Sequence, residues 1–103
     1  MTINTTIHKD DIGTDFDITF LEKGDAVDIS GATTKQLIFR APDAGKATQA
    51  GSFITDGTDG RLRYTTVDGD IDEAGHWHIQ GKIINASGTF YSSIEDFYVK
   101  PNL

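Results

Sequence analysis

The clearest pattern in the sequence is His76-Trp77-His78-Ile79-Gln80-Gly81-Lys82-Ile83, in which polar and apolar residues alternate. Because successive side chains of a β-strand point to opposite faces, this period of two predicts a strand with one buried and one solvated face. We therefore predict a central strand over residues 76–85. Its apolar face would lie in the core, with Trp77 at the centre.

The same alternation recurs on both sides of this strand. It predicts further strands over four ranges, which are 14–21, 35–41, 61–65 and 89–100. The inward positions of all these strands make up the predicted core, which consists of Phe16, Ile18, Phe20, Leu37, Phe39, Leu62, Tyr64, Trp77, Ile79, Ile83, Phe97 and Val99.

Two segments depart from a simple alternation. Residues 46–55 predict an edge strand whose inward side is undecided, because Phe53 and Ile54 compete for it. In the last strand the inward positions change parity between Ile94 and Phe97. One extra residue re-aims every side chain after it, so we predict a β-bulge near Glu95 or Asp96.

Turn signals separate the strands. Asp56-Gly57-Thr58-Asp59-Gly60 contains two Asp-Gly pairs and predicts a hairpin that leads into residues 61–65. Asp70-Ile71-Asp72-Glu73-Ala74-Gly75 predicts one helical turn, with Asp70 as N-cap and Gly75 at its end.

Short strands with a turn about every ten residues are typical of a β-sandwich. For these 103 residues, which include no cysteine, we predict an all-β fold: an immunoglobulin-like sandwich of about seven antiparallel strands with one short helical turn. The sandwich would span residues 12–103, preceded by residues 1–11 as an arm or first edge strand. Its stability would come from burial and backbone pairing alone.

Charge and hydropathy exclude several classes of partner. Sixteen acidic residues against nine basic ones give a net charge of −7, which disfavours nucleic acid. No stretch approaches the roughly 18 to 20 apolar residues of a membrane span, so we expect no membrane insertion. Residues 1–13 lack the apolar centre of a signal peptide, so we expect synthesis in the cytoplasm without export.

No catalytic or cofactor motif is present, and we predict no enzyme, no cofactor and no metal. His76 and His78 lie two apart on a solvated strand face and could share a metal ion, but no third ligand follows at a suitable spacing. Residues 68–79 imitate the start of an EF-hand loop and then fail, because Ile79 stands at the twelfth position. A looser calcium site would join Asp56 and Asp59 to this loop; turn and capping roles are the alternative.

Eight short segments, spread over about residues 12–101, carry a resemblance to a known family. They are Asp11-Ile12-Gly13-Thr14, residues 27–33, Phe39-Arg40-Ala41-Pro42-Asp43, residues 55–60, Tyr64-Thr65-Thr66, residues 70–77, Phe90-Tyr91-Ser92 and Phe97-Tyr98-Val99. Through these segments the chain resembles the immunoglobulin-like domain of tailed-bacteriophage virion proteins, similar to the N-terminal domain of baseplate upper proteins.

The resemblance implies a non-enzymatic structural protein of the virion, as a capsid decoration, neck, tail or baseplate component. Its partners would be other virion proteins of a capsid or tail scaffold, contacted by many copies. Contacts would come from residues 1–11, the edge strands and residues 101–103. The alternative is a host-surface attachment or carbohydrate-binding module, for which Tyr91, Tyr98 and Phe53 are the candidate exposed aromatics.

Overall fold

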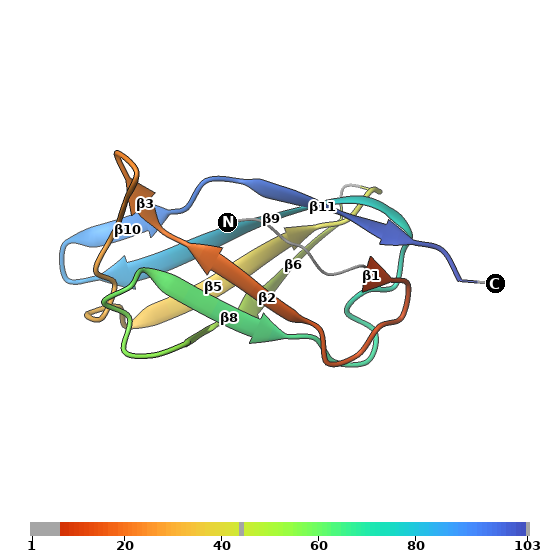
Figure 1. The fold of residues 1–103 in the computed structure, drawn as a ribbon, viewed down its shortest axis with the longest axis horizontal. Helices are drawn as coiled ribbons and strands as arrows, with labels where there is room; N and C mark the ends of the chain where they lie inside the picture. The colour runs from red at the N-terminus through yellow and green to blue at the C-terminus, as the bar shows by residue number, and fades with distance from the viewer. Residues whose placement is uncertain (1–6, 44, 103) are drawn as a thin grey trace.

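Nine of the eleven strands in the described residues form two β-sheets that face each other across one apolar core (Figure 1). The structure is a computed structural model, and it describes residues 7–43 and 45–102. All elements in these residues are strands, so the predicted all-β sandwich is confirmed. No helix in the described residues is long and apolar enough to cross a membrane.

The larger sheet has six strands and carries the predicted central strand in its middle. Its strands are β1 (Ile7–His8), β5 (Thr34–Arg40), β6 (Lys46–Ala50), β9 (Gly75–Asn85), β10 (Gly88–Tyr91) and β11 (Glu95–Lys100). The order is β1-β11-β9-β5-β6, and β10 pairs with β9 as well. β1 pairs with β11 in parallel, which corrects the expectation of an antiparallel fold throughout.

The smaller sheet has three strands in the order β2-β8-β7. They are β2 (Asp15–Thr19), β7 (Ser52–Phe53) and β8 (Arg61–Thr65), and β3 (Leu21–Glu22) and β4 (Asp25–Ala26) form a separate hairpin. The predicted hairpin is present, because Phe53 of β7 pairs with Leu62 of β8.

The segment 46–55 belongs to both sheets. β6 is an edge strand of the larger sheet and β7 of the smaller one, and the chain changes sheet at Gly51. A Cβ at Gly51 would lie 2.6 Å from Cδ1 of Leu37, so any larger residue at this crossing would have to displace the buried Leu37 side chain. This change of sheet explains why no single parity describes the segment.

The core is an aromatic cluster around Phe16. The ring centroid of Phe16 lies 4.7 Å from that of Phe97 and 5.3 Å from that of Phe39. Trp77 joins the cluster from one side, stacked on Phe97, so Phe16 holds the central position that the sequence assigned to Trp77. The predicted core residues are buried, apart from Tyr64, which is half-buried against them.

The sequence pattern missed three buried isoleucines, Ile7, Ile29 and Ile71. None of them lies in a run of alternating residues long enough to indicate a strand. Ile71 lies in the segment predicted as a helical turn, which is instead an irregular bend with the Ile71 side chain 1% exposed. A single helical turn gains little by itself, so the burial of Ile71 decides this conformation.

The predicted β-bulge exists but lies earlier than expected. Tyr91 pairs with Lys82, and Glu95 pairs with Ile79. The segment from Tyr91 to Glu95 therefore contains one residue more than the segment of β9 that it faces. The extra residue therefore lies between Tyr91 and Glu95. As a consequence Ile94 points into solvent, whereas Phe97 and Val99 return to the core.

Candidate functional site

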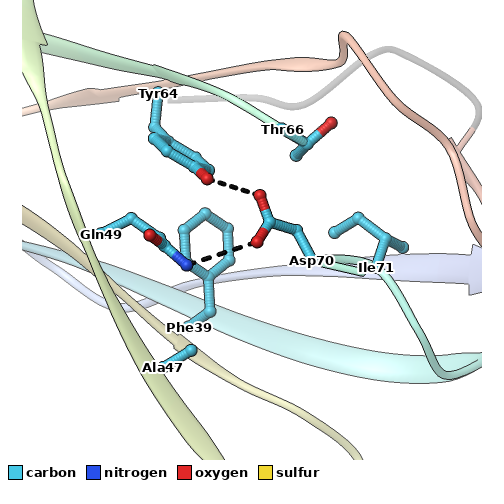
Figure 2. Close-up of a pocket in the computed structure, with 7 residues that line it drawn as sticks. All are labelled: Phe39, Ala47, Gln49, Tyr64, Thr66, Asp70 and Ile71. Carbon is cyan, nitrogen blue, oxygen red and sulfur yellow. Dashed lines mark hydrogen bonds between the residues drawn. The ribbon is translucent and has the colours of Figure 1, made fainter. Parts of the chain in front are cut away.

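Asp70 links three segments at one end of the sandwich (Figure 2). Its carboxylate accepts hydrogen bonds from the Tyr64 hydroxyl, from the backbone N–H of Val67 at 2.8 Å and from the Gln49 amide at 3.4 Å. The bond from Val67 closes a turn, so Asp70 does not cap a helix as the sequence suggested. The cavity beside these residues measures about 10 Å³. That is room for one water molecule, so this network is structural.

The Tyr64 hydroxyl has a strongly raised pKa. Burial, followed by the hydrogen bond to Asp70 and the charge of its carboxylate, raises the pKa of Tyr64 to about 12. All of these effects favour the neutral phenol. Tyr64 therefore acts as a protonated donor that ties the smaller sheet to the 66–74 loop.

The two strand histidines are exposed, as the alternation predicted. His76 contacts the Tyr98 ring, with ring centroids 5.0 Å apart. Across the part of the chain that the structure describes, no group of three or more His, Cys, Asp or Glu side chains is placed to hold a metal ion.

The loose calcium site is contradicted by the fold. Asp56 and Asp59 precede β8 and residues 68–72 follow it, so the two groups lie at opposite ends of that strand (Figure 1). Asp56 accepts hydrogen bonds from the backbone and hydroxyl of Thr58, and these bonds lower the pKa of its carboxyl group. Asp59 accepts a bond from the backbone of Arg61, so both acids serve the turn.

A separate hollow of about 440 Å³ lies on the outer face of the larger sheet. Its lining comes from β5, β6, β9 and the segment around the bulge, and consists of Ile38, Arg40, Lys46, His78, Ile79, Gln80, Tyr91 and Ile94. We call this hollow the outer groove. It is far larger than the cavity beside Asp70, and no acidic side chain lines it.

Strand register sets the basic side of the outer groove. Arg40 pairs with Lys46 on β6 and with His78 on β9, so three basic side chains form one row across the sheet. Asp96 continues the row beyond His78, outside the groove lining. The positive charge therefore concentrates at the β5–β6 side of the groove.

The bulge builds the opposite, apolar wall. Ser92 is buried, and its hydroxyl accepts a hydrogen bond from the N–H of Gly81 at 2.8 Å. The Ser92 carbonyl accepts one from the Gln80 amide at 2.9 Å. These bonds hold the extra residue in place, and Tyr91 and Ile94 on either side remain 55% and 64% exposed.

The three candidate aromatics separate in the structure. Tyr91 lines the outer groove, whereas Tyr98 is exposed on the same sheet next to His76 and outside the groove lining. Phe53 packs against the core, with Lys35 Nζ 4.6 Å from its ring centroid. Phe53 is therefore not part of an exposed platform.

The outer edge of β6 has no strand partner among the described residues. The backbone hydrogen bonds Ala41 N to Gly45 O and Gly51 N to Lys35 O show which residues face β5. Because hydrogen-bonded pairs alternate in an antiparallel ladder, the backbone groups of Ala47 and Gln49 face β5. Those of Lys46, Thr48 and Ala50 therefore point outward.

Comparison with known proteins gives a fold and no family. No protein-family model matches the sequence, and no curated protein matches it. A similar solved structure is the crystal structure of CopC from Methylosinus trichosporium OB3b, with a TM-score of 0.57. It shares 12% sequence identity, and the match covers 96% of this chain and 90% of that chain. The likeness is one of fold alone.

Proposed function

We propose that this chain is a non-enzymatic structural module of a tailed-phage virion that assembles through its open sheet edge. The observation that carries the proposal is the free side of β6. β6 carries one charged residue, Lys46 at its start, whereas residues 47–50 are Ala-Thr-Gln-Ala, without charge or proline. Natural edge strands are usually protected by charged residues or proline. A stretch of edge without them favours strand addition by a partner.

The fold and charge of the chain agree with a scaffold role. A strand added to β6 would gain backbone hydrogen bonds from Lys46, Thr48 and Ala50 without changing the core. Each contact would be small, but many copies on a symmetric particle raise the effective concentration of neighbouring sites. The net charge of −7 would keep unassembled copies soluble. Of the other predicted contacts, those in residues 1–6 and 103 lie outside the described residues.

The first test asks whether the protein is part of the particle. We expect mass spectrometry of gradient-purified virions to detect it in a fixed ratio to the major capsid or tail protein. Detection in infected-cell lysate together with absence from purified virions would contradict the proposal.

The second test addresses the edge itself. Thr48→Pro removes one outward N–H and leaves the β5–β6 ladder intact, because proline is tolerated where the N–H faces solvent. We expect this variant to fold normally and to be lost from particles. Thr48→Ala keeps the N–H and is the matched control. Incorporation of Thr48→Pro at the wild-type ratio would show that β6 is not the assembly edge.

A further inference from the structure

We propose that the outer groove is a binding site for a carboxylated sugar, such as a uronic acid unit of a surface polysaccharide. This ligand site goes beyond the scaffold role and does not depend on it. The proposal rests on three properties of the groove, which are its charge, its wall and its size.

The charge of the groove is opposite to that of the molecule. Arg40, Lys46 and His78 line it, although the whole chain carries −7. Within the described ranges, the ion pairs involve Arg63 on the smaller sheet, and none involves these three side chains. The Arg40 guanidinium is therefore available to bind a carboxylate through two parallel hydrogen bonds.

The same charge distribution limits the size of the anion. A long polyanion such as nucleic acid would gain little at three basic side chains and would be repelled by the remaining acidic surface. A ligand that carries a single carboxylate avoids this repulsion. Because Asp96 flanks His78, the carboxylate is expected between Arg40 and Lys46.

The apolar wall suits a ring. Tyr91 is 55% exposed on the far side of the groove from Lys46, and Ile94 extends this apolar wall. Lys82 Nζ lies 5.8 Å from the Tyr91 ring centroid, so one face of the ring is left for a ligand. An aromatic side chain of this kind stacks well against the apolar face of a sugar ring. The hydrogen bonds of Ser92 hold this wall in place before a ligand arrives, so binding costs little ordering of the protein.

The size of the groove favours a sugar over an acidic peptide. At about 440 Å³ the groove lies within the range of roughly 300–1,000 Å³ that is typical of small-ligand sites. An extended peptide would find backbone partners at the β6 edge and none along the groove floor, where the strands are already paired. A ring with one carboxylate uses both walls at once.

The test compares two ligands that differ in the charged group. Methyl β-D-glucuronide and methyl β-D-glucoside are titrated into the full-length, isotope-labelled protein, and binding is followed by backbone amide chemical shifts. We expect the glucuronide to bind about ten-fold or more tightly than the glucoside, because a charge-assisted pair replaces a neutral one. Shifts should concentrate at β5, β9 and residues 91–94. Equal binding of both sugars, or no binding of either, would overturn the proposal.

Variants separate the two walls. Arg40→Gln and Tyr91→Ala should each weaken glucuronide binding about ten-fold, because each removes one wall of the groove. Arg61→Gln and Tyr98→Ala are matched controls, since both residues are exposed and lie outside the groove. The sugar site would be contradicted if the control variants lost as much affinity for the glucuronide. It would also be contradicted if a hexa-aspartate peptide bound more tightly than the sugar. Thr48→Pro should bind the glucuronide normally, so failure of the scaffold proposal and failure of this one are distinguishable.

Discussion

The two faces of the eleven-residue strand β9 differ in what their side chains contact. The inner face carries Trp77, Ile79 and Ile83, and each of these side chains is buried in the core. The outer face carries His76, His78 and Gln80, which contact neighbours on the same sheet and solvent. Substitutions on the inner face should therefore change stability, whereas those on the outer face should change binding and leave stability almost unaltered.

The largest effect is expected from Trp77→Ala. The substitution removes the ring that stacks on Phe97 and the hydrogen bond from the indole N–H to the Glu73 carbonyl. We expect a loss of about 3–5 kcal/mol in the free energy of unfolding, which is measured by urea denaturation and circular dichroism. Tyr98→Ala on the outer side of the sheet should cost far less. Similar losses for the two variants would contradict the distinction between faces.

A smaller loss of folding stability is expected from Gly81→Ala, which adds a methyl group to the inner face of β9. A Cβ at Gly81 would lie 2.8 Å from Cζ of Phe20 and 3.0 Å from Cγ2 of Ile18. Gly81→Ala should therefore destabilise the fold by about 1–3 kcal/mol through overcrowding. Phe20→Leu makes room for the new methyl group, so the double variant should lose less than the sum of the single ones. Simple additivity would show that the crowding lies elsewhere.

Tyr64 provides a pH-dependent test of the inner region. Because its pKa is raised to about 12 in the folded state, its contribution is fully present below pH 10 and is lost as the pH rises toward 12. Tyr64→Phe should lower the free energy of unfolding by about 1 kcal/mol at pH 8, because Asp70 loses a donor. The difference from wild type should shrink between pH 10 and pH 12, as measured by urea denaturation at each pH. A difference that stays constant over this range would contradict the role of the protonated phenol.

The smallest effect on stability is expected from substitutions on the outer face of β9. His76→Ala and His78→Ala should each change the free energy of unfolding by no more than about 0.5 kcal/mol, as is usual for exposed positions. Thermal melting followed by circular dichroism would measure this change. A loss above 1 kcal/mol, of the order expected for a buried group, would show that the outer face supports the fold as well.

Much of the sandwich was predictable from local sequence. The strand predicted over residues 61–65 coincides with β8, and the strand predicted over 76–85 differs from β9 by one residue. Alternation works for β8 and β9 because each of them has one buried and one more exposed face. It failed for residues 70–75, where turn-forming residues imitate a helix cap and the burial of Ile71 decides the conformation.

The candidate site was not predictable in the same way. Arg40, His78 and Tyr91 are far apart in the sequence, and only strand register brings them to one groove. The parity change in the last strand did indicate a bulge, but its position depends on the hydrogen bonds between Ser92 and Gly81. Hydrophobic alternation contains no information about these bonds.

The sequence by itself determined that the chain is all-β, which residues point inward on its long strands, and that its surface is acidic. Those properties follow from overall composition and from the local alternation of the longer core strands, which does not depend on their neighbours. Only the tertiary structure decided which strands pair, where the chain changes sheet and where the basic side chains gather. These properties depend on contacts between distant segments, and many pairings would satisfy the same alternation.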